Sequence, residues 1–194
     1  MRNKFNLVKP MSEPSTFFDG GKDFRKDWPS ATFISDSEYA RAMEAFPRPC
    51  TDVLAIQPES KSLILAKRKH QSALGVWMFG GGQRMGETPR ETAVRLMKRE
   101  IGINFLPEDL EFLWISVNFW MHRNPKPQDR GEHGIIFTFV FVPTPEELKI
   151  ISNSLDPEEY DLTHSIRSYT LEDLESLKES HKVKLIEYWH AVFG

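Results

Sequence analysis

The order of apolar and polar residues divides this chain into an irregular beginning and a longer, regularly patterned remainder. Residues 1–33 are polar, carry repeated prolines and glycines and show no sustained period, so we expect an extension that is irregular or drapes over a neighbour. Residues 37–46 place their apolar side chains on one stripe, and Pro47 follows, a pattern that predicts a short amphipathic helix. We therefore expect an N-terminal extension over 1–33 and one folded domain over 34–194.

Runs rich in β-branched and aromatic residues predict the strands of that domain. Such runs occupy residues 52–57, 62–67, 111–120 and 134–142. The last two flank a proline-rich loop, 121–133, which is long enough to be a substrate lid or an insertion. Helical patterns follow at 145–151 and, from a capping box at Thr170, along a tail that runs in one or two pieces to Phe193. Strands before and after a central helix, with a helical end, predict an α+β sandwich.

The central helix has clear signals at both ends and follows a glycine-rich turn. Thr88 is placed as its N-cap, with Pro89 at the first helical position and Glu91 closing the capping box. Gly102 stands where a glycine ends a helix. The sequence therefore predicts a helix between Thr88 and Gly102.

Positions 96, 99 and 100 share one face of this helix because they are spaced by three and four residues. Three carboxylates on that face would hold a cluster of divalent cations through oxygen ligands. The chain has Leu96, Arg99 and Glu100 there. One carboxylate beside a cation cannot hold two or three Mg²⁺ ions against their mutual repulsion. A single Mg²⁺ is still compatible if carbonyls, water and substrate phosphates complete its shell.

Composition narrows the class of protein. A chain of 194 residues suits one domain with an appendage, and a net charge of −3 argues against nonspecific nucleic-acid binding. The single Cys50 excludes an intrachain disulfide framework and suits a reducing compartment. The N-terminus lacks the apolar core of a signal peptide, and no apolar run is long enough to span a membrane. We expect a cytoplasmic protein with no membrane and no nucleic-acid partner.

The stretch 80–103 reads GGGQRMGETPRETAVRLMKREIGI. It resembles the Nudix box: G, five residues, E, seven residues, R-E-U-x-E-E-x-G-U, where U is bulky and apolar. The residues that fit position by position are Gly81, Glu87, Arg95, Met97, Glu100, Gly102 and Ile103. Leu96 and Arg99 replace two glutamates of the pattern. The chain is thus similar to the Nudix hydrolase superfamily, whose fold is a mixed β-sheet sandwiched between α-helices.

The replaced glutamates make the box similar to that of the GDP-mannose mannosyl hydrolases. The run from Ile34 to Asp52, the Lys67–Arg68 pair and the segment 167–170 extend this similarity. Departures accompany it, because Gly82 stands where that family has an arginine and Gly134 where it has a tyrosine. The metal-binding glutamine of the family is replaced by Thr163 or, in the gap-free register, by Leu162.

The resemblance implies a set of site residues and one Mg²⁺ ion, or Mn²⁺ in its place. The residues are Gly80 and Glu100 for the metal, His164 and Asp52 for catalysis, and Arg68, Arg95 and His133 for the substrate. Simpler roles stay open for four of them. His164 would be an ordinary surface histidine, His133 a cap on the proline-rich loop, Asp52 a strand-edge charge and Arg68 part of a solvated basic turn.

Loss of the acidic cluster favours attack on carbon over attack on phosphorus. Attack on phosphorus needs a metal-bound hydroxide and charge neutralisation. Attack on the anomeric carbon of a nucleoside-diphosphate sugar needs one Mg²⁺, arginines on the departing diphosphate and a separate base such as a histidine. The leading hypothesis is therefore a Mg²⁺-dependent hydrolase that converts GDP-mannose and water into GDP and mannose.

Two alternatives remain beside that hypothesis. One is an inactive Nudix module that binds a nucleotide or a protein partner, and the other is a Nudix pyrophosphatase that cleaves a phosphoanhydride. Relatives of this type are often homodimers, and the apolar stripe of 37–46 fits either a homodimer contact or a contact within one chain.

Overall fold

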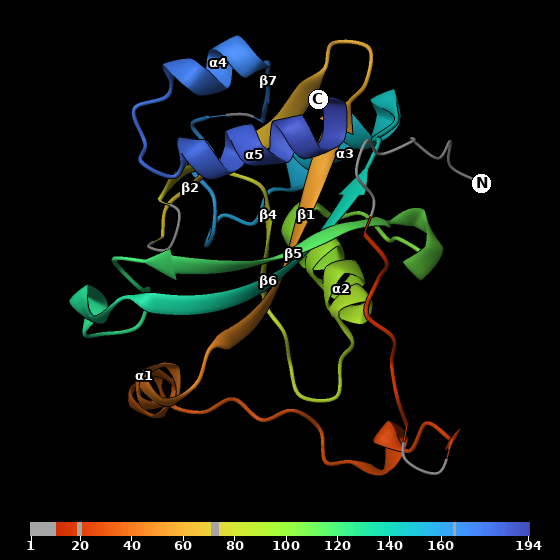
Figure 1. Cartoon of the computed structure of the whole chain (residues 1–194), viewed down its shortest axis with the longest axis vertical. Helices are drawn as coiled ribbons and strands as arrows, with labels where there is room; N and C mark the ends of the chain where they lie inside the picture. The colour runs from red at the N-terminus through yellow and green to blue at the C-terminus, as the bar shows by residue number, and fades with distance from the viewer. Residues whose placement is uncertain (1–10, 19–20, 71–73, 165) are drawn as a thin grey trace.

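The computed structural model describes residues 11–18, 21–70, 74–164 and 166–194. They form the predicted α+β fold, a mixed β-sheet with helices on its faces (Figure 1). The strands are β1 (Arg48–Gln57), β2 (Ser62–Arg68), β3 (Gly75–Trp77), β4 (Phe79–Gly82), β5 (Glu111–Trp120), β6 (Glu132–Phe141) and β7 (Arg167–Tyr169). The helices are α1 (Asp36–Ala45), α2 (Pro89–Ile101), α3 (Pro145–Ser154), α4 (Leu171–Ser176) and α5 (Lys182–Phe193).

The sheet is built around β1, which makes three strand pairings. The main order is β3-β2-β1-β6-β5, with β4 also paired to β1 and β7 to β2. The pairing of β1 with β6 is parallel and the others are antiparallel. Because β4 pairs antiparallel with β1, the three glycines of β4 (Gly80, Gly81 and Gly82), here called the glycine turn, lie beside Cys50 and Asp52.

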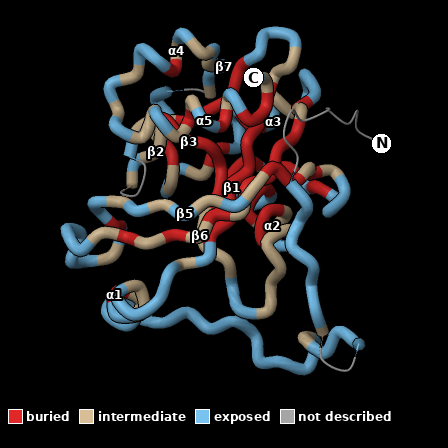
Figure 2. Tube along the Cα trace, in the orientation of Figure 1, coloured by how far each residue is buried: buried red, intermediate tan, exposed pale blue. Residues whose placement is uncertain are grey.

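Two apolar cores cover the two faces of the sheet, since side chains alternate along each strand. Val53 and Ala55 of β1 pack with α2 and α3, whereas Leu54 and Ile56 pack with α4 and α5. Figure 2 shows the buried residues concentrated where β1 runs between these helices. The sheet is therefore sandwiched between helices, as the sequence predicted.

Helix α2 has the ends that its sequence predicts. The Thr88 side chain accepts a hydrogen bond from the Glu91 amide while the Glu91 carboxylate accepts one from the Thr88 amide, and Gly102 ends the helix in the left-handed region with φ 73°. Leu96 is fully buried in the core shared with α3. The apolar replacement at position 96 is therefore part of the packed interior.

Other predicted elements agree with the structure except at their ends. Strand β1 starts four residues earlier than the apolar run suggests, because it pairs with β6 from Arg48 onward. The helical tail is broken into α4 and α5, and Leu177 between them has extended backbone. The proline-rich loop is fixed to α1, since the buried Arg123 donates to the Ala40 carbonyl at 3.1 Å and to Glu44 at 3.0 Å.

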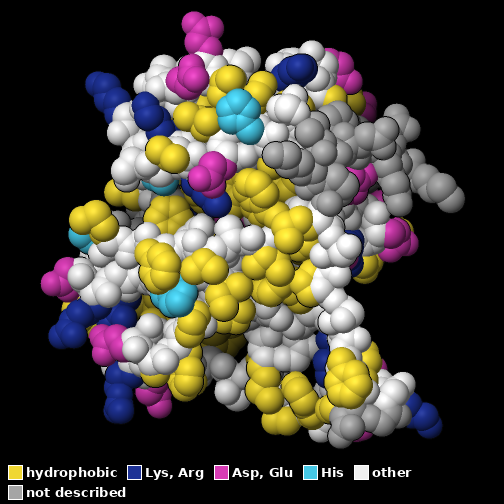
Figure 3. Space-filling view, in the orientation of Figure 1, with side chains coloured by type: hydrophobic (Ala, Val, Ile, Leu, Met, Phe, Trp, Pro, Cys, Tyr) yellow, Lys and Arg dark blue, Asp and Glu magenta, His cyan; other side chains and the backbone are white. Residues whose placement is uncertain are grey.

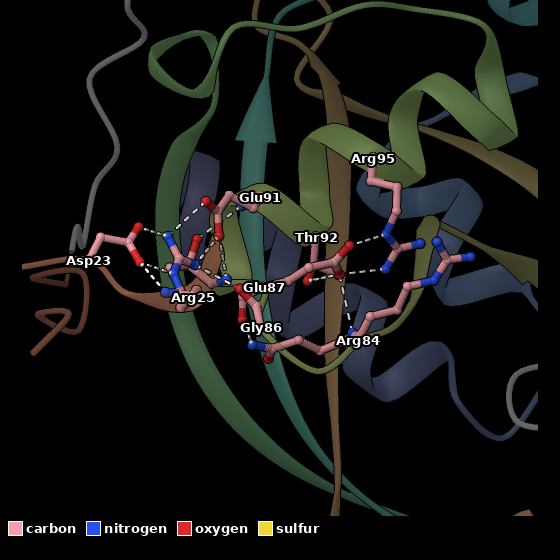
Figure 4. A network of polar contacts seen from close by, with 10 residues as sticks. Asp23, Arg25, Arg84, Gly86, Glu87, Glu91, Thr92 and Arg95 are labelled. Atoms are coloured by element: carbon pink, nitrogen blue, oxygen red, sulfur yellow. Dashed lines mark hydrogen bonds and ion pairs between the residues drawn. The ribbon is translucent and has the colours of Figure 1, made fainter. Parts of the chain in front are cut away.

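The described part of the N-terminal extension contacts α2 and the loop between β4 and α2 of the same chain. Arg25 donates to the Gly86 carbonyl at 2.8 Å and to Glu91 at 2.7 Å (Figure 4). In the same network, Glu87 pairs with Arg95 at 2.5 Å and accepts from Thr92 at 2.8 Å. These contacts fix the loop between β4 and α2, and with it the position of the glycine turn. Residues 1–10 and 19–20 of the extension lie outside the described residues.

The outer side of the edge strand β5 is apolar and exposed. Figure 3 shows hydrophobic side chains gathered across the middle of this view. The exposed members at and just after β5 are Ile115, Val117, Phe119 and Met121. In the described part of the chain, no helix has the length and apolar character needed to cross a membrane.

Candidate functional site

A cavity of about 390 Å³ opens beside the glycine turn and gathers polar side chains from most of the sheet. Its floor includes Arg48, Cys50 and Asp52, which share one face of β1. Arg68 at the end of β2 and Arg99 of α2 complete a set of three arginines. Other lining residues are Asp36, Tyr39, Trp77, Asn118, Trp120, Asn124, Glu132 and Glu159. The predicted lid loop thus contributes to the cavity through Asn124.

Glu100 lies beneath this cavity with a side chain that is fully buried. Its Oε2 accepts from the Gly80 amide at 3.0 Å and from the Tyr160 hydroxyl at 2.5 Å. Its Oε1 accepts from Arg99 Nη2 at 2.6 Å. Burial raises the pKa of Glu100, against the lowering by Tyr160 and the nearby guanidinium of Arg99. Both oxygens of this carboxylate are therefore already engaged by donors from the protein.

Asp52 is one of the carboxylates that line the cavity. The side chain is buried, and a Cβ placed on Gly80 would lie 2.3 Å from Asp52 Oδ1, so glycine is required there. Burial raises the pKa of Asp52 to about 7, against the lowering by Arg68 and by a hydrogen bond from Trp77. A carboxylate with a pKa near 7 suits proton transfer at neutral pH.

Arg48 and Arg68 are each held by one carboxylate and keep an unused donor. Arg48 Nη1 donates to Glu132 at 3.0 Å, and Arg68 Nη2 donates to Glu159 at 3.2 Å. Within the described structure, the buried Nε atoms of both arginines have no hydrogen-bond partner. These Nε atoms have almost no accessible surface, so a ligand in the cavity would meet the other, accessible nitrogens of the two guanidinium groups.

The guanidinium of Arg48 also stands at a place where the resemblance implies another arginine. A Cβ on Gly82 would lie 2.7 Å from Arg48 Nη2. The missing side chain at position 82 therefore leaves the space that the Arg48 guanidinium fills. The charge comes from a different strand but reaches the same turn.

Three of the residues implied for substrate and catalysis lie away from the cavity lining. Arg95 pairs with Glu87 and donates to the Gly82 carbonyl at 3.1 Å, so it supports the glycine turn from behind. His133 stacks on Phe119 with ring centroids 4.5 Å apart, on the face of β6 opposite Glu132. His164 is exposed, and its Nδ1 lies 2.8 Å from Asp161.

A family model for the NUDIX domain matches residues 46–189, most of the chain. The chain belongs to the Nudix family. Solved structures of this fold agree, among them a MutT NUDIX hydrolase from Burkholderia pseudomallei, with TM-score 0.55 and 16% identity over 73% of this chain and 97% of that one. The NUDIX domain of Shewanella oneidensis NrtR, complexed with ADP ribose, has TM-score 0.51 and 15% identity over 79% and 96%. A NUDIX hydrolase from Nitrosomonas europaea has TM-score 0.50 and 15% identity over 75% and 90%. No curated protein matches this chain.

Nudix hydrolases generally use divalent metals, and Gly80 and Glu100 are the donors that the box would offer to the expected Mg²⁺ ion. Both oxygens of Glu100 accept hydrogen bonds, and one of them is paired with Arg99. Among the residues that the structure describes, no group of three or more His, Cys, Asp or Glu side chains is placed to hold a metal ion. The donor set of this Nudix domain therefore does not fit a metal centre on Gly80 and Glu100.

The sequence patterns missed Arg48 and Tyr160, which prove central to the Nudix site. Arg48 carried a signal, since it precedes Cys50 and Asp52 by steps of two along one strand. Tyr160 carried no signal, because its contact with Glu100 joins residues 60 positions apart. The acidic partners Glu132 and Glu159 depend in the same way on long-range folding.

Proposed function

We propose that this Nudix protein hydrolyses a nucleoside-diphosphate sugar by attack of water on the anomeric carbon. The observation that supports this most is the cavity itself, in which Arg48, Arg68 and Arg99 surround the buried Asp52. The specific reaction that we propose to test first is GDP-mannose plus water giving GDP and mannose. This reaction cleaves the bond between the anomeric carbon and the diphosphate oxygen.

The three arginines suit the departing diphosphate. A guanidinium presents several N–H donors in a fixed plane and binds phosphate oxygens in pairs. The carboxylates Glu132 and Glu159 hold Arg48 and Arg68 in place, and both arginines line the cavity. Donors that are positioned before the reaction stabilise the charge that develops on the leaving oxygen.

Asp52 is the base in this proposal. As water attacks, its oxygen bonds to the anomeric carbon, its proton passes to Asp52, and the electron pair of the breaking bond stays on the diphosphate. An oxocarbenium-like centre needs only this modest activation of water. His164 was the base expected by resemblance, but its side chain lies outside the cavity lining and pairs with Asp161. Arg95 and His133 act in this account by supporting the glycine turn and β6.

The fold is compatible with a ligand of this class. The Shewanella oneidensis NUDIX domain of similar fold is complexed with ADP ribose, a nucleoside diphosphate linked to a sugar. In the present chain Tyr39 and Trp120 line the cavity around the arginines. Aromatic faces of this kind stack on bases or sugars. No step of the proposal runs through a metal ion, because Glu100 Oε2 accepts two hydrogen bonds and Oε1 is paired with the guanidinium of Arg99.

The test is product analysis with a panel of nucleoside-diphosphate sugars that includes GDP-mannose and ADP-ribose. Phosphorus and proton NMR distinguish GDP plus mannose from GMP plus mannose 1-phosphate. The proposal expects the first pair with the wild-type chain and a kcat about 10²–10⁴-fold lower with Asp52→Asn. Formation of the second pair would mean phosphoanhydride cleavage and would overturn it.

A second candidate is a Nudix module that binds a nucleotide without turnover. The hydrogen bonds that Glu100 accepts from Gly80, Tyr160 and Arg99 favour this candidate, since they engage the carboxylate that an acidic metal site would use. Tight nucleotide binding by calorimetry together with no product from any sugar nucleotide would select this candidate.

A further inference from the structure

We propose that the guanidinium of Arg99 is the resident cation of this cavity, so that the diphosphate of the ligand binds there without a divalent metal ion. This inference rests on the proposed function only in taking the ligand to carry a diphosphate. The Arg99 side chain would then supply the positive charge that divalent metal ions generally supply in Nudix hydrolases.

The contact between Arg99 and Glu100 fixes the guanidinium at the cavity. Arg99 Nη2 donates to Glu100 Oε1 at 2.6 Å, and Glu100 is fully buried while 42% of the Arg99 side chain is exposed. One edge of the guanidinium is therefore held by a buried carboxylate. The exposed remainder lines the cavity and keeps further N–H donors.

The position of this cation is set by the glycine turn. A Cβ on Gly81 would lie 3.7 Å from Arg99 Nη2 and 3.9 Å from Glu100 Oε1. Leu96 Cδ2 lies 3.5 Å from the same point, and Leu96 belongs to the buried core. The turn thus faces an apolar side chain and a guanidinium, where an intact box would present carboxylates.

A divalent ion could reach Glu100 only by displacing a donor or by sharing Oε1 with the guanidinium of Arg99. The Arg99 guanidinium holds Oε1, and the donors Tyr160 and Gly80 hold Oε2. An added cation would also meet repulsion from Arg99 at close range. Binding a phosphate oxygen needs no such displacement, because the free donors of Arg99 already face the cavity.

Calorimetric titration of GDP and of inorganic pyrophosphate into the full chain tests this directly. The wild-type chain should bind with the same Kd in excess EDTA and in MgCl₂. Arg99→Gln should weaken binding about 10-fold or more, the usual worth of a hydrogen bond to a charged group. Arg99→Lys should keep most of the affinity because it keeps the charge. The matched control is Lys98→Gln, which removes one positive charge from the exposed neighbouring position and should bind like the wild type.

A second titration follows the metal alone. Electron paramagnetic resonance of Mn²⁺ should show the ion free in the presence of the wild-type chain. Arg99→Glu places a second carboxylate beside Glu100, so this variant should bind Mn²⁺ and should bind GDP only when the metal is present.

Three results would overturn the proposal: loss of ligand binding by the wild type in EDTA or in both buffers, unchanged binding by Arg99→Gln, or tight binding of one Mn²⁺ by the free wild-type chain. If Arg99→Gln does not fold, the EDTA comparison and Arg99→Lys still decide. Turnover is not measured in these titrations, so their failure is separate from failure of the proposed hydrolysis.

Discussion

The Tyr160 hydroxyl donates a 2.5 Å hydrogen bond to Glu100 Oε2, and both side chains are buried. This bond joins the segment before β7 to helix α2. Tyr160→Phe leaves a buried carboxylate with one donor fewer at nearly the same volume. We expect a loss of about 1–3 kcal/mol in the free energy of unfolding. Urea titration measures it, with Tyr169→Phe on the more exposed strand β7 as the matched control. Equal stability of the two variants would contradict a structural role for this bond.

Asp52 should make stability depend on pH. Its pKa is raised to about 7 from an unfolded value of 3.8, chiefly by burial, with Arg68 and Trp77 opposing the shift. The folded state therefore binds a proton more tightly than the unfolded chain. This group lowers stability as pH rises from about 4 to about 7, and the loss is complete above that range.

Asp52→Asn should relieve this penalty. We expect the variant to gain at least about 1 kcal/mol over the wild type at pH 8, or roughly 2–4 °C in Tm for a domain of this size. The gain should shrink toward pH 4, where the folded carboxyl is protonated and the unfolded carboxyl is close to its own pKa of 3.8. Thermal melts at the two pH values measure the difference. A gain that does not change with pH would show that Asp52 has an ordinary pKa.

Activity should separate Asp52 from His164. Asp52→Asn should lower kcat about 10²–10⁴-fold, the usual contribution of a general base. His164→Ala should leave kcat unchanged, because the imidazole is exposed and lies outside the cavity lining. Steady-state kinetics with the sugar nucleotide that the protein hydrolyses measures kcat for both variants. The opposite pattern would return the base role to the histidine.

The ion pair between Glu87 and Arg95 should stabilise the glycine turn (Figure 4). Glu87→Gln removes the charge that holds Arg95, and Arg95 in turn donates to the Gly82 carbonyl at 3.1 Å. We expect a loss of about 1–3 kcal/mol in the free energy of unfolding. The exposed Glu108→Gln on the following loop serves as the control for loss of one negative charge. No difference between the two in urea would contradict this role.

The elements of the fold could be read from the sequence because their signals are local. Thr88 and Thr170 each form the capping box that their spacing suggests, and the helix expected from position 145 begins there, so the starts of three helices agree with the pattern. The early start of β1 could not be read, since Pro49 hides it and the parallel pairing with β6 creates it. The sequence left open whether the helical tail runs in one or two pieces, and the extended Leu177, which packs against the core, separates α4 from α5.

The site was less predictable than the fold because it is built from distant segments. Asp52 and Arg68 were expected from resemblance, and the structure brings both to the cavity. The spacing that places Arg48 on the same face of β1 as Asp52 was present in the sequence. The sequence did not show that Glu132 would hold the Arg48 guanidinium. Arg99 and Glu100 are neighbours in the sequence, but their ion pair could not be predicted from it. The pair forms because the fold buries Glu100 and leaves Arg99 partly exposed.

Hydrolysis in water labelled with ¹⁸O tests the central claim most directly. The claim is that water attacks carbon, so the nucleoside diphosphate must leave with its original oxygens. Mass spectrometry of the released nucleotide should therefore find no ¹⁸O in its phosphates, with the label in the sugar. Incorporation of ¹⁸O into a phosphate of either product would place the attack on phosphorus and contradict the account.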